Sequence, residues 1–252
     1  MNIRPFNLVY FLCIFIIIAL IIVTTLLCKE KSEKTKMIVL LSICGFNLLL
    51  FIAYKIGLAS NPSDLQEHGY RFIIWEELPL HLCNISLFLV PIGLLIKNSK
   101  LLAYGFYIAP LGAFLAVCSP AIEFIDVNIF KIYNFGFYFT HLNIVLVGVL
   151  LVTLGFFKPR FKEVPFLNVY AAVLATIIHF VNLLIRWLTG SNANYFYTVQ
   201  TDGVSILEMF WSIIPYSYIY LIFAIVILNV YIVIVTLPFH LVEKKKGSTV
   251  NA

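Results

Sequence analysis

The chain has 252 residues, of which 62% are hydrophobic and only 12% are charged. Soluble globular domains are about 45–50% apolar and about 25% charged, so this composition excludes that class and predicts an all-α, polytopic membrane protein. The net charge of +5 does not indicate nucleic-acid binding, because the basic residues are concentrated in short segments between apolar runs. We expect a single domain over residues 1–252, since no polar stretch is long enough to fold separately.

Seven apolar runs are candidates for helices that cross the bilayer, which takes about 20 residues. The first run resembles a signal peptide, but its apolar core is long and lacks a small-residue cleavage site, which predicts an uncleaved helix. The last run is long enough to be tilted or bent at Pro215. The expected bundle therefore has seven transmembrane helices, at about 7–28, 36–58, 78–96, 101–118, 137–157, 165–188 and 211–238.

The lysines and arginines predict the orientation of this bundle. Twelve of them fall in the segments 29–36, 97–100, 158–163 and 243–246, and five fall on the opposite side. We therefore expect the N-terminus outside and the C-terminus in the cytoplasm. The basic segments are expected to act as cytoplasmic anchors that also attract anionic lipid.

With this orientation, polar side chains from four helices reach one depth near the outer surface. Ionisable residues inside a membrane are costly and favour a functional interpretation. The structural alternative is a helix cap followed by ordinary hydrogen-bonded polar residues. The converging residues are Glu77, His81, Cys83, Asn84, His141, Asn143, His179, Asn182, Arg186 and Glu208.

Cys83 is the candidate nucleophile of this group. If its helix begins near Leu78, Pro79 occupies the first turn and Cys83 the second, where the helix dipole favours a thiolate. His81 lies about 200° around the helix from Cys83, which makes it unsuitable as the base. A base must then come from another helix, either His141 or His179, and the depth of His141 favours it.

Amide side chains complete this candidate site. Asn84 and Asn182 are candidate donors to an oxyanion. His179, Asn182 and Arg186 share one helix face, because they are spaced at i, i+3 and i+7. A cysteine–histidine pair with amide donors is the minimal set of groups for acyl transfer through a thioester.

Two other functions compete with acyl transfer. A zinc-dependent lipid hydrolase would use three imidazoles with one carboxylate, although no spaced metal motif supports it. A non-enzymatic transporter or lipid-binding protein would use the polar cluster as a pocket. A disulfide between Cys83 and Cys118 is a further alternative for the thiol. The zinc ligands would be His81, His141 and His179 with Glu77, Glu208 or Asp202.

Three segments resemble the YwaF-like integral membrane proteins, a bacterial group related to an animal transmembrane acyltransferase of ether phospholipids. The similarity covers nearly the whole chain and implies a phospholipid substrate, with Cys83 as the acyl-accepting cysteine and His141 as its partner. One departure is Tyr197-Thr198-Val199-Gln200, where bacterial members tend to have an aliphatic residue followed by Lys-Pro. The matching segments are Leu78-Pro79-Leu80-His81-Leu82-Cys83-Asn84, His141, and Asn182…Gly190…Asn194-Tyr195-Phe196.

The expected function is therefore acyl transfer or acyl hydrolysis on a phospholipid or lysophospholipid in a bacterial plasma membrane, without a metal or other cofactor. Cys83 is the nucleophile, and His141 is the general base and then the acid. The remaining roles are oxyanion stabilisation by Asn84 and Asn182, substrate binding by His179, Arg186, Asn194 and Tyr195, and support of the reactive groups by His81, Glu77 and Glu208.

Overall fold

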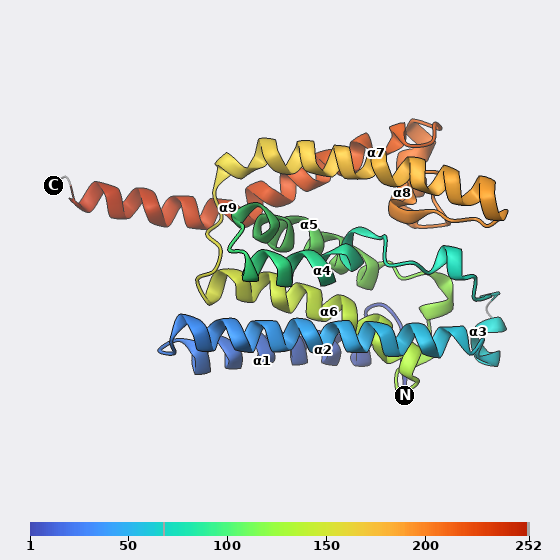
Figure 1. The fold of residues 1–252 in the computed structure, drawn as a ribbon, viewed down its shortest axis with the longest axis horizontal. Coiled ribbons are helices and arrows are strands. Elements are labelled where there is room, and N and C mark those ends of the chain that lie inside the picture. Colours follow the sequence, from blue (N-terminus) through green and yellow to red (C-terminus); the bar gives the residue numbers. More distant parts are fainter. Residues whose placement is uncertain (68, 251–252) are drawn as a thin grey trace.

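The computed structural model describes residues 1–67 and 69–250, without the side chains of residues 122 and 245–250. Helices dominate the fold (Figure 1), which confirms the all-α prediction. The long helices are α1 (Leu8–Cys28), α2 (Glu33–Ala59), α5 (Ser99–Cys118), α6 (Ile132–Thr153), α7 (Val164–Thr189) and α9 (Ile222–Val250). The shorter ones are α3 (Ser63–Gln66), α4 (Leu82–Leu95) and α8 (Ser205–Ile213).

Short elements connect these helices. Two-residue strands β1 (Asn2–Ile3) and β2 (Val127–Asn128) pair antiparallel and tie the N-terminus to the segment before α6. Single 3-10 turns form η1 (Ile74–Glu76), η2 (Ile122–Phe124), η3 (Phe161–Glu163), η4 (Tyr195–Tyr197) and η5 (Ile219–Leu221).

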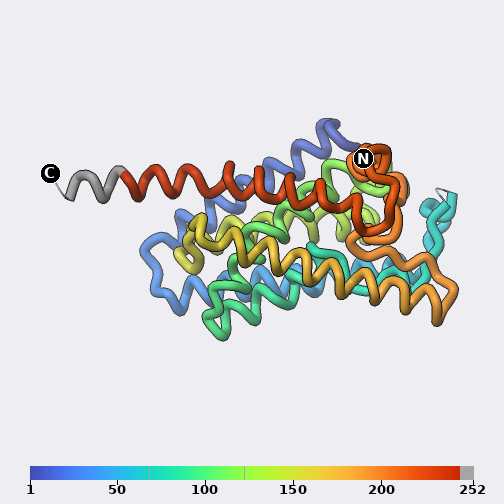
Figure 2. The backbone as a smooth tube through the Cα atoms, turned by 90° about the horizontal axis from the view of Figure 1, so that it is seen from above, coloured from blue at the N-terminus to red at the C-terminus, as the bar shows by residue number. Residues whose placement is uncertain are grey.

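The membrane-spanning character of the chain is confirmed. Within the described residues, six helical stretches are long and apolar enough to cross a membrane, and the 14-residue α4 is a shorter apolar helix beside them. The chain begins at one end of the bundle, and α9 runs toward the other (Figures 1 and 2). We call the end with the segments 60–81, 119–131 and 190–204 the loop end, and the end with the lysine-rich segments the basic end.

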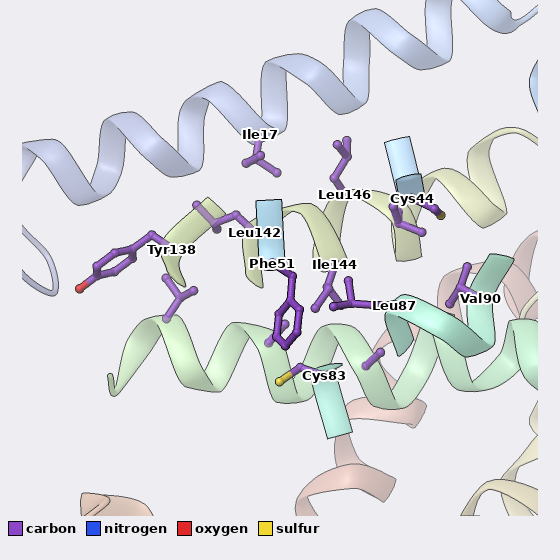
Figure 3. Packing of buried hydrophobic residues seen from close by; sticks show 14 of the residues in the cluster. Ile17, Cys44, Phe51, Cys83, Leu87, Val90, Tyr138, Leu142, Ile144 and Leu146 are labelled. Atoms are coloured by element: carbon purple, nitrogen blue, oxygen red, sulfur yellow. The ribbon is translucent and has the colours of Figure 1, made fainter. Parts of the chain in front are cut away.

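The core forms around α6, which packs against α1, α2 and α5, while α4 packs on α5. Small residues allow this close approach: a Cβ on Gly136 would lie 2.1 Å from Cβ of Tyr54, and one on Gly148 would lie 2.9 Å from the carbonyl oxygen of Gly105. Cys83 belongs to the resulting apolar cluster (Figure 3). The helices α7 and α9 lie beside α5, and α9 continues beyond its neighbours at the basic end (Figures 1 and 2).

The third helix begins later than predicted. The expected start was near residue 78, but α4 begins at Leu82 with His81 as its N-cap. The preceding segment is non-helical, and its backbone bonds to distant groups: Leu78 N–H donates to the Tyr195 hydroxyl at 2.9 Å, and that hydroxyl donates to the Trp75 carbonyl at 2.7 Å. Non-helical backbone is tolerated at membrane depth only where protein or water satisfies it in this way.

The seventh helix is divided, which corrects the single helix expected over 211–238. Its first part, α8, ends at Ile213, and α9 begins at Ile222 after η5. Pro215 disfavours helical backbone at Ile214, which is extended at φ −129° and ψ 91°. Tyr218 then reverses the chain at φ 65°.

The other helices occur where they were predicted, with one shift. The fifth predicted helix begins at Ile132 rather than at residue 137, because the aromatic residues just before 137 extend the same helix by about one turn. It ends four residues early, at Thr153, and Gly155 follows at φ 88°. The earlier start brings Asn134, Tyr138 and His141 onto one helix face.

Candidate active site

The thiol of Cys83 and the imidazole of His141 meet inside the bundle. Their Sγ and Nε2 atoms are 3.4 Å apart, and both side chains are buried, at 7% and 5% exposure. Cys83 comes from the first turn of α4 and His141 from the middle of α6, 58 residues later in the chain. The structure thus brings these two candidate residues within contact distance of each other.

The other ring nitrogen of His141 determines which tautomer faces the thiol. Nδ1 lies 2.7 Å from the carbonyl oxygen of Phe137, one turn earlier on α6. A carbonyl oxygen can only accept a hydrogen bond, so Nδ1 carries the proton in the neutral ring. Nε2 then presents its lone pair to Cys83, which is the arrangement that a base needs to accept the thiol proton.

Cys83 occupies the first turn of α4, not the second turn that the expected helix start implied. The first four N–H groups of a helix have no partner within it, and they carry a partial positive charge. The N–H groups of Cys83 and Asn84 lie within reach of the Cys83 sulfur. The Asn84 side-chain oxygen lies 3.7 Å from the same sulfur. Negative charge that develops at Cys83 is thus stabilised by backbone dipoles.

An ion pair lies beside this thiol. Lys55 of α2 pairs with Glu77, and the two side chains are only 20% and 17% exposed. The Tyr70 hydroxyl donates to the second Glu77 oxygen at 3.2 Å. The ammonium of Lys55 interacts electrostatically with both Cys83 and His141. Glu77 is therefore linked to the reactive pair through Lys55, a lysine that we had not singled out.

Two tyrosines from the 190–204 loop enclose His81. Its ring centroid is 5.3 Å from that of Tyr195 and 5.5 Å from that of Tyr197. Phe196 and Tyr197 both adopt left-handed backbone, at φ 60° and 56°, which is costly for residues with side chains. The surrounding hydrogen bonds hold the loop in this conformation. This strained turn places the Tyr197 ring against the start of α4.

The Tyr197 hydroxyl is available for a ligand. It interacts electrostatically with Cys83, and it forms no hydrogen bond with the residues that the structure describes. Burial raises the pKa of Tyr197 above its usual range, so the phenol stays protonated and can donate. Tyr104 also interacts with Cys83, but its hydroxyl already donates to the Leu82 carbonyl at 2.5 Å.

Asn182 holds the loop rather than facing Cys83. Its Nδ2 donates to the Tyr195 carbonyl at 2.8 Å and to the Thr198 hydroxyl at 2.9 Å, while its Oδ1 accepts from Tyr195 N–H at 2.9 Å. The side chain is fully buried. These three bonds occupy the amide, which leaves no donor directed at an oxyanion and corrects the expected role.

Other predicted site residues also bind the loop. Arg186 Nε donates to the Ala193 carbonyl at 2.8 Å, and Asn194 Nδ2 donates to the Gln200 carbonyl at 2.7 Å. The Thr201 hydroxyl bonds to Glu208. Burial raises the pKa of Tyr195 to about 12, which keeps its hydroxyl protonated for the bond to Trp75. These polar groups therefore bond within the protein, and contact of Arg186, Asn194 and Tyr195 with a substrate stays a prediction.

His179 lies apart from the reactive pair. Its ring centroid is 5.1 Å from that of Tyr218, on the side of α7 that faces the α8–α9 connection. Its Nδ1 is buried without a hydrogen-bond partner among the described residues. The polar groups predicted at one depth thus form a reactive cluster and a loop cluster, and His179 lies near Thr198 of the loop rather than near Cys83.

The three histidines do not assemble into a zinc site. In the described part of the chain, no group of three histidine, cysteine, aspartate or glutamate side chains could hold a metal ion. The donors that a zinc hydrolase requires are therefore not brought together. The disulfide alternative also fails, because all five cysteines are free, and Cys118 lies 3.3 Å from the Tyr10 hydroxyl instead.

The site predicted from the sequence did not include Lys55, Tyr197 or Glu76. Lys55 carried a usable signal, because an ionisable residue within an apolar run is a functional candidate by default. The only sequence signal for Tyr197 was that it lies in the segment that departs from the Lys-Pro pattern of the bacterial proteins. Glu76 accepts the Asn192 N–H at 2.5 Å and so joins the α4 entrance to the loop. Its role depends on a contact between residues 116 positions apart.

Comparison with known proteins gives one match. Neither the curated proteins nor the solved structures yield a match for this chain. A family model, the TMEM164 family, matches residues 3–236. That range begins in β1 and ends within α9, so it includes every residue of the reactive pair, the ion pair and the 190–204 loop. The chain belongs to the TMEM164 family of membrane proteins.

Proposed function

We propose that this protein transfers an acyl chain from a membrane phospholipid through a thioester on Cys83, with His141 as the base. One observation carries the proposal: His141 Nε2 lies 3.4 Å from the Cys83 sulfur while Nδ1 bonds to the Phe137 carbonyl. A nucleophile, a base and a group that orients the base are the recurring parts of covalent catalysis. The resemblance to YwaF-like proteins and the location in a bacterial plasma membrane are part of the same proposal.

In the first half-reaction, His141 Nε2 accepts the proton of the Cys83 thiol. The thiolate attacks the ester carbonyl carbon, and the carbonyl oxygen takes up the negative charge of the tetrahedral intermediate. The carbon–oxygen bond to the glycerol then breaks. His141 donates its proton to the leaving oxygen, which gives a lysophospholipid and the Cys83 thioester.

The second half-reaction uses the same groups in reverse. His141 accepts a proton from the hydroxyl of a lysophospholipid or from water. The resulting nucleophile attacks the thioester carbon, and Cys83 leaves as a thiolate. The proton on His141 then returns to Cys83. A lipid acceptor makes the reaction a transfer, and water makes it a hydrolysis.

Donors for the oxyanion come from the start of α4 and from the loop. The backbone N–H groups of Cys83 and Asn84 belong to the free first turn of the helix, and a helix N-terminus favours an anion. We assign a third donor to the hydroxyl of Tyr197, which has no partner among the described residues. In this proposal Asn84 acts through its main-chain N–H, whereas the sequence had suggested its side-chain amide.

The residues around this centre position it. His81 separates Tyr195 from Tyr197 and so places the phenol of Tyr197, while the Lys55–Glu77 pair supplies positive charge near the thiolate. We assign Asn182, Arg186, Asn194 and Tyr195 to holding the loop, because their polar atoms bond to its backbone. With these residues assigned to the loop, the groups that contact the lipid headgroup would lie on the surface at the loop end.

A trapped thioester tests the proposal. Purified full-length protein is incubated with a phospholipid that carries a labelled acyl chain, denatured in acid and treated with neutral hydroxylamine. We expect covalent label that hydroxylamine releases, because hydroxylamine cleaves thioesters far faster than oxygen esters. Cys83→Ala should remove the label, and Cys118→Ser, at the same end of the bundle, should retain it.

The result distinguishes acyl transfer from simple lipid binding. A transporter or lipid-binding protein would hold the label only until denaturation, in wild type and in both variants. Covalent label that persists in Cys83→Ala would also refute the proposed nucleophile. A label that resists hydroxylamine would identify an oxygen ester in place of a thioester.

Tyr197→Phe is expected to lower kcat for acyl transfer about 10- to 100-fold, somewhat less than the loss of a principal oxyanion donor. The ring that packs against His81 remains, so folding and KM should change little. The control is Tyr216→Phe, because Tyr216 is 65% exposed and lies outside the site. A Tyr197→Phe enzyme with wild-type kcat would show that the phenol is not a donor in the transition state.

A further inference from the structure

A cavity of about 380 Å³ opens at the basic end of the bundle. It lies where α2 and α5 begin and where α4 and α6 end. Leu94 lines it, eleven residues along α4 from Cys83, which corresponds to about 16 Å at 1.5 Å per residue. The cavity is therefore separate from the reactive pair, and its chemistry is considered independently of acyl transfer.

The floor of this cavity is apolar. Leu94, Leu102 and Leu154 are 1%, 4% and 5% exposed, and Met37 and Phe156 are half-buried beside them. Pockets that bind small molecules have volumes of about 300–1,000 Å³ and mostly apolar walls with a few polar groups. Such a floor suits the glycerol and the first methylene groups of a lipid.

The rim of the cavity is polar and mainly basic. It carries Lys36 and Lys97, together with Glu33, which pairs with Lys97 at 3.0 Å. That pair is 71% and 68% exposed, and exposed ion pairs contribute little because water screens them, so an anion can compete for Lys97. The positive ends of the α2 and α5 dipoles also lie at this rim.

The surrounding charge further selects for anions. Four lysines lie in residues 29–36 and two in 97–100, and the Lys100 ammonium rests 5.2 Å from the Phe166 ring centroid nearby. Basic pockets between transmembrane helices bind acidic lipid headgroups. Two of the lysine-rich segments, 29–36 and 97–100, thus border a shaped cavity.

We propose that this cavity binds the headgroup of an anionic phospholipid from the adjoining leaflet. The phosphate lies between Lys36 and Lys97, and the glycerol and upper acyl chains lie over Leu94, Leu102 and Leu154. Zwitterionic lipid fits this site less well, because its cationic group would meet the same lysines. The site requires no reaction at Cys83.

Lipid titration tests this site. Full-length protein in phosphatidylcholine nanodiscs is titrated with phosphatidylglycerol, and the midpoint of thermal unfolding is recorded. We expect phosphatidylglycerol to raise the midpoint, and the double variant Lys36→Gln/Lys97→Gln to need at least tenfold more lipid for the same shift. Lys158→Gln is the matched control, since Lys158 pairs with Glu243 at the same end and does not line the cavity.

A second variant tests the shape of the cavity without changing its charge. Met37→Trp narrows the cavity without removing a lysine, and we expect it to weaken the response to phosphatidylglycerol as well. The proposal is overturned if both variants respond like wild type, or if additional phosphatidylcholine gives the same shift. An equal shift with inorganic phosphate alone would indicate a free-phosphate site and would also overturn it.

Discussion

Replacing His141 with glutamine is expected to slow acylation of Cys83 by about 100- to 10,000-fold, the range that a positioned general base contributes. Glutamine can place a polar atom near the thiol, but it cannot accept a proton as the imidazole does. The Phe137 carbonyl currently fixes the ring so that Nε2 faces the sulfur at 3.4 Å. Single-turnover measurement of the labelled thioester reports this step directly.

The control for this substitution is His240→Gln. His240 is exposed near the end of α9, where its ring centroid lies 5.5 Å from that of Phe161 and is remote from the thiol. We expect its acylation rate to stay within about twofold of wild type, as for most surface substitutions. Wild-type acylation in a folded His141→Gln protein would eliminate His141 as the base.

A double variant strengthens this test. Groups that act as a unit in catalysis are strongly non-additive, so the residual rate of overall lipid turnover, measured as release of the labelled acyl chain, should be no lower in Cys83→Ala/His141→Gln than in Cys83→Ala alone. The thermal unfolding midpoint of each variant separates a loss of chemistry from a loss of folding. Additive losses would indicate that the two residues act in different steps.

The reactive pair was predictable because it follows from helix order and depth. Cys83 and His141 lie on helices that were recognised from apolar runs, and the topology places both near the same end. The start of α4 was not predictable in this way. The non-helical segment before it bonds to Tyr195, 117 residues away from Leu78, and local propensity contains no information about that bond.

The roles of the amide and guanidinium groups were also beyond sequence reasoning. Helix periodicity correctly placed Asn182 and Arg186 on one face of α7, but periodicity does not choose hydrogen-bond partners. Both groups bond to the loop that follows their own helix, because its irregular backbone must be satisfied away from water. A polar residue at the correct depth is thus as available for building a loop as for binding a ligand.

Gly136→Ala is expected to lower the free energy of unfolding by about 3 kcal/mol, at the upper end of typical overpacking costs. The added Cβ would lie 2.1 Å from Cβ of Tyr54 and 3.3 Å from its Cα, so the backbones of α2 and α6 must separate. Unfolding by denaturant in detergent micelles measures the loss. Gly45→Ala is the matched control, because a Cβ there meets no atom within 4 Å.

The same substitution should reduce acyl transfer as well as stability, because Gly136 lies at the contact between α2, which carries Lys55, and α6, which carries His141. Tyr54 precedes Lys55 on α2, and Gly136 precedes Phe137, whose carbonyl orients His141. Moving α2 away from α6 therefore displaces the ion pair relative to the imidazole. Gly45→Ala should be neutral or slightly stabilising, by up to about 1 kcal/mol from helix propensity, with unchanged transfer. Equal stability of the two variants would mean that the α2–α6 contact is more adaptable than its packing indicates.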